Sequence, residues 1–216
     1  MHIAIPLYDR FTALDAVGPY EVLARLPGAT VTFVGERTGP VRTETGALAI
    51  TVDATLADVE SPDVIVVPGG PGTRAMLEPG PLHDWVRAAH ATTQWTTSVC
   101  TGALILGTAG VLEGLEATTH WSTLDLLAPL CATVVGDRRV VPQGKVVTAA
   151  GVSSGIDMAL WLAAQIAGDD VARAIQLGIE YDPQPPFDSG STAKADPELV
   201  EFVRALTTDA EPARDG

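Results

Sequence analysis

Basic side chains are scarce in this chain. Its 216 residues include 13 Lys and Arg against 27 Asp and Glu, which gives a formal net charge of −14. Because nucleic acids and anionic membranes attract basic surfaces, this composition predicts neither as a partner. Cysteine is rare too. Cys100 and Cys131 are the two in the chain, and two thiols leave little room for a disulfide framework or a four-thiolate zinc site.

Long apolar runs and an export signal are missing as well. The longest strongly apolar stretch, residues 99–112, is interrupted by threonine and glycine and is shorter than the roughly 20 residues that span a bilayer. The first ten residues carry no basic segment ahead of an apolar one, as an export signal would. We therefore expect a cytoplasmic protein, in whose reducing surroundings a free thiol persists.

Apolar residues make up 46% of the chain, enough for a sizeable core in one domain. Short β-rich runs alternate with helical patterns along the sequence. The expected strands are residues 3–7, 30–35, 63–67, 95–99, 117–119, 133–135, 140–142 and 146–149, with a hairpin over 41–52. The expected helices are residues 19–26, 82–91, 101–109, 123–130, 156–167, 169–180 and 196–207.

This alternation predicts a single-domain, three-layer α/β sandwich with a mostly parallel central sheet. We expect the domain over residues 1–191, and over residues 192–216 a C-terminal helix with a frayed tail packed on the same domain. Ligands of such sheets bind at the carboxyl ends of the strands. The loops of interest are therefore those after Leu7, after Val67, after Val99 and around Gly151.

The strongest candidate for chemistry is Cys100, in the run TSVCTGA. A β-rich run meets a helical one there without a spacer, and small residues flank the cysteine, as the sharp turn of a nucleophile elbow requires. At a helix start, unpaired amides and the helix dipole favour the thiolate. The alternative is a buried structural cysteine. Cys131 has apolar neighbours, and we interpret it as part of the core.

A cysteine nucleophile needs a proton partner, and histidine is the usual one. The chain has His2 at its terminus, His83 and His90 on a helix that we expect at the surface, and His120 after the elbow helix. His120 is the one placed to fold back over the sheet edge. Catalysis by His120 and a histidine satisfied by local hydrogen bonds both stay open.

Asp15 lies in an apolar stretch between the first strand and the first helix. A carboxyl group there is either held near a reacting group with a raised pKa or caps the helix ahead of Pro19. The turn at Pro68, Gly69 and Gly70 ends a buried strand and offers amides without side chains. Such amides suit an oxyanion or polar-atom cradle, although an ordinary tight turn has the same sequence.

The order of these features resembles the DJ-1/PfpI superfamily, from Met1 to about Ser191. Within it, the chain is most similar to the isocyanide hydratases. The motifs that carry this resemblance are LDAVGP at residues 14–19, SVCTG at 98–102, ATTHW at 117–121, GVSSGID at 151–157 and EYDPQPPFDSGS at 180–191. PfpI-type peptidases carry His directly after the nucleophile, where this chain has Thr101. The DJ-1 and glyoxalase-like branch places Glu at the early acidic position, where this chain has Asp15.

The resemblance implies a hydro-lyase that adds water to an isocyanide and releases an N-substituted formamide. Cys100 attacks the terminal carbon to form a thioimidate, while Asp15 gives a proton to the nitrogen and later activates the hydrolytic water. Thr101 positions Asp15 or the water, and its amide stabilises the cysteine. Substrate or intermediate contacts are expected from Gly69, Gly70, His120 and Val152. No metal or other cofactor is implied, and relatives of this kind usually form homodimers.

Two rival functions stay open at this point. Cys100 is also suited to redox sensing in a non-catalytic ligand-binding protein, because an accessible thiolate oxidises readily. A glyoxalase-like enzyme acting on reactive carbonyls uses the same cysteine. For the loop that begins at Gly151, we expect a place beside the elbow and a gating role, in which the helix at Ile156 shifts during turnover. A rigid glycine turn is the alternative.

Overall fold

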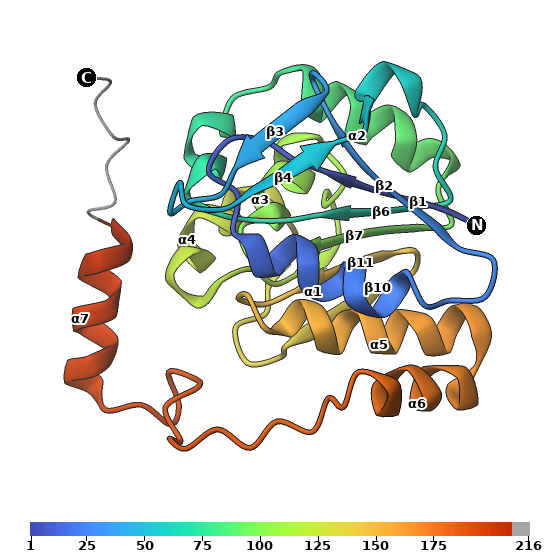
Figure 1. Cartoon of the computed structure of the whole chain (residues 1–216). Helices are drawn as coiled ribbons and strands as arrows, with labels where there is room; N and C mark the ends of the chain where they lie inside the picture. The colour runs from blue at the N-terminus through green and yellow to red at the C-terminus, as the bar shows by residue number, and fades with distance from the viewer. Residues whose placement is uncertain (209–216) are drawn as a thin grey trace. The chain divides into compact units, whose positions relative to one another are not determined.

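The computed structural model describes residues 1–208. Among these residues the central sheet has the strand order β10–β11–β7–β6–β1–β2–β5 (Figure 1). All neighbours in it are parallel except β10 and β11. Its strands are β1 (His2–Pro6), β2 (Thr30–Gly35), β5 (Ala54–Thr55), β6 (Val64–Val67), β7 (Trp95–Val99), β10 (Val140–Gln143) and β11 (Val146–Ala149). The prediction of a mostly parallel sheet is confirmed.

Helices cover both faces of this sheet, which gives the three layers that the sequence predicted (Figure 1). Helices α1 and α5 pack against each other on one face, and α2 and α3 contact each other on the opposite face. The helices of residues 1–180 are α1 (Ala13–Leu23), α2 (Pro81–Thr92), α3 (Gly102–Thr108), α4 (Leu124–Leu127), α5 (Ser154–Ala167) and α6 (Asp169–Gly178). A further helix, α7 (Pro197–Thr208), follows in a second compact unit.

Shorter elements complete the described chain. The expected hairpin is confirmed as the antiparallel pair β3 (Gly39–Arg42) and β4 (Ala49–Val52). A further small pair is β8 (Glu116–Ala117) with β9 (Thr133–Val134). Short 3₁₀ helices occur at Leu56–Asp58, Pro71–Met76, Trp121–Thr123 and Ala128–Leu130. The helix predicted over 123–130 is therefore split, because Pro129 interrupts the α-helical hydrogen bonds.

The first helix differs from its prediction. We expected it to start at Pro19, but α1 starts at Ala13 and holds Pro19 in its interior. Proline favours the first turn of a helix, and here packing outweighs that preference. A Cβ atom on Gly18 would lie 3.0 Å from Ile156 Cγ1, so this part of α1 is in close contact with α5. The earlier start places Asp15 inside the helix.

The domain boundary also falls earlier than expected. The larger compact unit is Met1–Glu180, and a second unit begins at Tyr181. The Pro-rich residues 181–191, which we assigned to the domain, therefore belong to the unit that contains α7. Helix α7 confirms the helix expected over 196–207, and its packing on the domain stays a prediction. The expected frayed tail from residue 209 onward lies outside the described residues.

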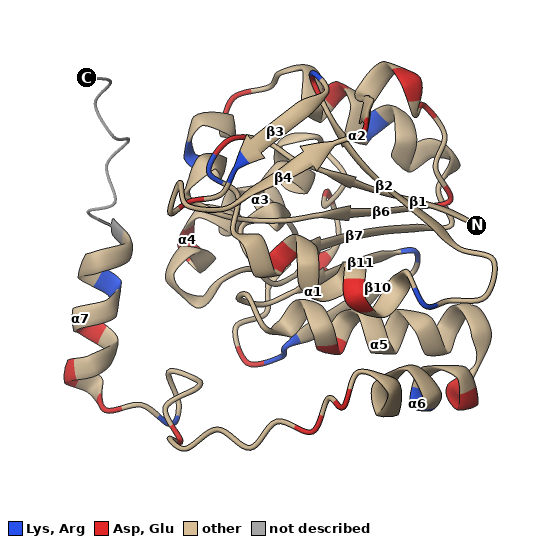
Figure 2. Ribbon diagram, in the orientation of Figure 1, with Lys and Arg blue, Asp and Glu red and all other residues tan. Residues whose placement is uncertain are grey.

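Charge is spread widely over the described chain. Figure 2 shows the Lys and Arg residues dispersed among loops and helix surfaces, interleaved with acidic residues. Several of them form ion pairs at the surface, such as Arg138 with Glu116 at 2.7 Å and Arg139 with Asp157 at 2.6 Å. Pairs this exposed contribute little to stability. Among residues 1–208, none of the helices has the length and apolar character needed to cross a membrane.

Candidate active site

Cys100 follows β7 directly and turns the chain sharply into α3. Its φ of 56° lies in the left-handed region, as in a strained nucleophile elbow. The Cys100 amide donates to the carbonyl of Ala149, the last residue of β11, at 3.1 Å and to that of Ala150 at 3.0 Å. A Cβ atom on Gly102 would lie 2.2 Å from the carbonyl oxygen of Val67. The elbow geometry predicted from the sequence is therefore present, and glycine is required for it.

The environment of the thiol differs from the sequence-based expectation. Cys100 is 5% exposed. Burial raises its pKa well above the usual value, the neighbouring Asp15 carboxylate raises it further, and backbone amides of Thr101 and Val152 oppose both effects. The helix start was expected to favour the thiolate, but desolvation of the charged form outweighs these amides. Burial therefore favours the neutral thiol of Cys100, which lies beside a carboxyl group that can take its proton when ionised.

Asp15 is the acid, and it is fully buried in the first turn of α1. Its Oδ2 accepts a hydrogen bond from the Gly69 amide at 2.9 Å. Its Oδ1 has no hydrogen-bond partner of normal geometry among the described residues. Thr12 occupies the N-cap position of α1, so the capping alternative for Asp15 is wrong. The carboxyl group instead joins the first helix to the loop after β6.

The protonation of Asp15 suits a proton carrier. Burial raises its pKa to about 7, although hydrogen bonds from Gly69 and from the Cys100 thiol favour the carboxylate. The charge of Glu44 raises the Asp15 pKa as well. Glu44 reaches this region from the β3–β4 connection, where its Oε2 accepts from the Thr12 hydroxyl at 2.9 Å. A group with a pKa near neutrality can both accept and donate a proton at physiological pH.

Both glycine amides of the turn after β6 already have protein acceptors. Gly69 donates to Asp15, and Gly70 donates to the Thr101 hydroxyl at 2.8 Å. The two amides that we expected to bind a reacting atom are therefore occupied in positioning the side chains of Asp15 and Thr101. The Thr101 hydroxyl is held by Gly70 and not by Asp15. A Cβ atom on Gly69 would lie 2.5 Å from the Thr101 amide nitrogen, so a larger residue would separate the two loops.

His120 is held by neighbours of its own segment. Its Nδ1 lies 2.7 Å from the Ser122 hydroxyl and accepts from the Ser122 amide at 3.3 Å. Because Nδ1 accepts, a neutral ring carries its hydrogen on Nε2. Burial lowers the pKa of His120, which favours that neutral ring. The ring also covers Gly151, where a Cβ atom would lie 2.5 Å from His120 Cδ2. This packing supports local satisfaction of His120.

The loop after β11 lies beside the elbow, as predicted. Val99 and Ala149 are register partners in the sheet, and the Val152 amide faces the Cys100 sulfur. The conformational strain lies one residue later than expected, because the positive φ, 35°, belongs to Val152 and not to Gly151. Gly155 does not leave the start of α5 loose: a Cβ atom there would lie 3.0 Å from a Val99 methyl.

The remaining histidines and Cys131 lie away from this chemistry. His83 was expected at the surface, but it is 2% exposed and its Nδ1 accepts from the Gly80 amide at 3.0 Å. His90 is paired with Thr96 at 2.8 Å. Cys131 is partly buried and packs against the core, which agrees with its interpretation as core.

Sequence reasoning missed two residues of the site. Tyr8, just after β1, donates to the Pro68 carbonyl at 2.7 Å. Burial raises the pKa of Tyr8, and negative charge on Asp15, or on Cys100 when its thiol is ionised, raises it further. Thr119 donates from its hydroxyl to the Cys100 carbonyl at 2.9 Å. Tyr8 lies at the carboxyl end of a parallel strand, where ligands of such sheets bind, so its position in the sequence was a signal that could have found it.

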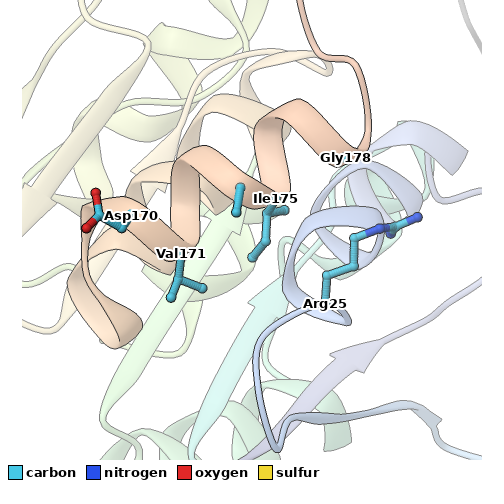
Figure 3. A pocket seen from close by; sticks show the side chains of 6 residues that line it. Arg25, Asp170, Val171, Ile175 and Gly178 are labelled. Carbon is cyan, nitrogen blue, oxygen red and sulfur yellow. The ribbon is translucent and has the colours of Figure 1, made fainter.

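A groove of about 420 Å³ lies elsewhere, between the C-terminal end of α1 and helix α6 (Figure 3). Its lining residues are Arg25, Asp170, Val171, Ala174, Ile175 and Gly178. None of them belongs to the Cys100 site. Helix α1 starts near the carboxyl ends of the parallel strands and runs back along the sheet. Its C-terminal end therefore lies near the amino ends of the strands. The groove therefore takes no part in the chemistry of the elbow.

The combination of a parallel three-layer sandwich, a strained cysteine elbow and a facing acid defines a class of proteins. A family model described as the DJ-1/PfpI family matches residues 1–165. The chain belongs to the DJ-1/PfpI family.

Two relatives match nearly the whole chain. It is 44% identical over 204 residues to an isonitrile hydratase of Pseudomonas putida, covering 94% of this chain and 89% of the relative. It resembles the crystal structure of a ThiJ/PfpI family protein from Pseudomonas syringae with a TM-score of 0.89 and 36% identity, covering 97% of this chain and 88% of that one. For Drosophila melanogaster DJ-1beta the TM-score is 0.76 at 25% identity, over 84% and 98% of the two chains.

Proposed function

We propose that this protein is an isocyanide hydratase, a hydro-lyase that adds water to R–N≡C and releases the formamide R–NH–CHO. The observation that carries the proposal is the pairing of the buried Cys100 thiol with Asp15, whose pKa is raised to about 7. The 44% identity to the Pseudomonas putida isonitrile hydratase supports the choice of substrate. An isocyanide has an electrophilic terminal carbon and needs both a nucleophile and a proton carrier.

The first step joins sulfur to carbon. The Cys100 sulfur attacks the terminal isocyanide carbon while its proton passes to the Asp15 carboxylate. Attack leaves an electron pair on that carbon, so Asp15 returns the proton to carbon and forms the thioimidate R–N=CH–S–Cys100. This balance corrects the expectation that nitrogen takes the proton in this step. Amides of Thr101 and Val152 face the sulfur and stabilise negative charge as it develops there.

The second step consumes water. Asp15, again a carboxylate, takes a proton from the water that attacks the thioimidate carbon and passes it to the nitrogen, which gives the tetrahedral adduct R–NH–CH(OH)–S–Cys100. The carbon–sulfur bond then breaks, the hydroxyl proton of the adduct passes through Asp15 to the sulfur, and the formamide leaves. Asp15 thus acts as acid and base in turn, which requires a pKa near the working pH. Thr101 assists by fixing the Gly70 loop, and the neighbouring Gly69 holds Asp15 in place.

The test is formamide production from an alkyl isocyanide by purified wild-type protein, followed by mass spectrometry. Cys100→Ala and Cys100→Ser are expected to abolish turnover while the circular dichroism spectrum is kept. Cys131→Ala, which removes the other thiol, is the matched control and is expected to retain activity. A wild type without activity on isocyanides contradicts the proposal. Turnover of an α-oxoaldehyde in its place would favour the glyoxalase-like alternative, and Cys100 oxidation without turnover would favour redox sensing.

A further inference from the structure

Cys100 needs support for its backbone conformation. A left-handed φ is unfavourable for a residue with a Cβ atom, and it persists where neighbouring groups hold it. On the amide side, the Cys100 N–H is shared between the carbonyls of Ala149 and Ala150. These two contacts restrain one peptide group of the elbow. The other peptide group, which carries the Cys100 carbonyl, needs a restraint of its own.

The hydroxyl of Thr119 supplies this restraint. It donates to the Cys100 carbonyl at 2.9 Å, whereas the amide of Ala103, in α3, contacts the same carbonyl at a longer 3.3 Å. Thr119 is 1% exposed, so water has little access to compete for this carbonyl. A hydrogen bond from a hydroxyl group in an environment without water is strong enough to fix the orientation of the peptide group that accepts it.

The same corner of the chain supports the other side of the thiol. His120, the next residue, covers Gly151 and thereby packs against the loop that presents the Val152 amide to the sulfur. Residues 119 and 120 therefore contact both the elbow and the loop that faces it. Sequence reasoning considered the histidine of the ATTHW motif, but the direct bond to the nucleophile's backbone comes from the threonine.

We propose that Thr119 is a positioning residue for the nucleophile. Its hydroxyl holds the Cys100 carbonyl and keeps the elbow left-handed, so that the sulfur stays directed at Asp15 and at the amides of Thr101 and Val152. This inference rests on the proposed role of Cys100 as the nucleophile, but it does not depend on which electrophile is the substrate. Without this hydrogen bond, the elbow relaxes and the sulfur moves out of the buried position beside Asp15. In that position, the lack of water and the Asp15 charge keep the thiol protonated.

The test compares wild type with Thr119→Val, which keeps the β-branched shape and loses the donor, and with Thr119→Ser, which restores the donor. The rate of Cys100 alkylation by iodoacetamide is followed from pH 7 to 11 by peptide mass spectrometry, because the wild-type pKa is raised well above the usual thiol value. In Thr119→Val we expect the midpoint of the pH dependence to fall by at least about half a pH unit, because desolvation and a like charge no longer raise the pKa. With an isocyanide substrate, kcat is expected to fall about tenfold with little change in KM, since misplacement affects the reacting geometry.

Thr97→Val is the matched control. Thr97 is fully buried and donates to the Ile65 carbonyl at 2.9 Å, so it loses the same kind of bond away from the elbow. We expect it to alter neither the alkylation midpoint nor kcat, while Thr119→Ser restores both. If Thr119→Val does not fold, Thr119→Ala is used in its place, because alanine also lacks the hydroxyl donor.

An unchanged midpoint and kcat in the donor-free variant, or equal changes in Thr97→Val, would overturn the proposal. A wild type inactive on isocyanides would refute the proposed function, and the alkylation measurement would still decide the role of Thr119.

Discussion

Replacing Asp15 by Asn should make the protein more stable and nearly inactive at the same time. The folded state holds the Asp15 carboxyl without water, and its pKa rises from the usual 3.8 to about 7. Between these two values the folded state keeps a proton that the unfolded chain has released. The free energy of unfolding therefore falls as the pH rises through this range and changes no further above about pH 7.

The size of this effect follows from the pKa. At about 1.4 kcal/mol for each pKa unit, the rise from 3.8 to about 7 destabilises the folded state by up to about 4 kcal/mol at pH 8. Asn does not ionise and avoids this cost. Its carbonyl can still accept from the Gly69 amide. Its amide hydrogens take the place of Oδ1, which has no hydrogen-bond partner of normal geometry among the described residues, and they find no acceptor to match. Such a buried group costs about 1–3 kcal/mol.

We therefore expect Asp15→Asn to gain about 1–3 kcal/mol at pH 8, which is roughly 2–12 °C in Tm for a chain of this size. At pH 4 the gain should turn into a loss of about 1–3 kcal/mol, because Asp15 is then protonated in the folded protein and only the cost of the buried amide remains. Urea unfolding at pH 4, 6 and 8 measures the trend. Formamide production should fall at least about 10²-fold, the usual contribution of a general acid–base group.

Asp125→Asn is the matched control for this experiment. Asp125 lies exposed in the first turn of α4, and we expect its replacement to change stability by less than about 0.5 kcal/mol at each pH. A loss of about 1 kcal/mol in Asp15→Asn at every pH, with activity retained, would mean that the carboxyl group acts only as a local hydrogen-bond acceptor. That result would refute the reasoning from burial.

Three further predictions concern the surroundings of the site. Glu44→Gln removes a charge that raises the Asp15 pKa. The pH at which kcat/KM falls on the acid side should therefore decrease by about 0.3 unit. An unchanged profile, or an equal shift in the exposed control Glu113→Gln, would contradict this. Gly151→Ala forces a Cβ atom to 2.5 Å from His120 Cδ2 and should slow hydrolysis of the covalent intermediate more than its formation, whereas equal effects in pre-steady-state kinetics would reject gating by this loop. Light scattering at micromolar concentration should give the mass of a homodimer, and a monomer mass would contradict that prediction.

Much of the fold was predictable because its signals are local. Runs such as VIVV, now β6, are apolar at every position and form strands buried on both faces. The errors arose where contacts between distant segments override local preference. Pro19 marked a helix start by its own preference, but packing of Gly18 against Ile156 extends α1 to Ala13. His83 was assigned to the surface, but its helix turns it toward the interior.

The candidate site was predictable in part, for the same reason. The elbow at Cys100 is a local pattern of small residues, and a carboxyl group in an apolar stretch marks Asp15 as unusual. No local pattern indicates that the amides of Gly69 and Gly70 donate hydrogen bonds to Asp15 and Thr101. Nor does one indicate Thr119, because its partner is a backbone carbonyl, which every residue has.

The sequence by itself determined the layered sheet, the sharp turn at Cys100 and the kinds of side chain available for chemistry, since hydrophobic period and residue size act over a few neighbouring positions. Only the tertiary structure decided that Asp15, from the first helix, faces the thiol after β7, and that burial raises the pKa of both groups. Proximity between such distant positions depends on the order of strands in the sheet. A pKa depends on how much water that packing removes, and no single segment of the chain contains that information.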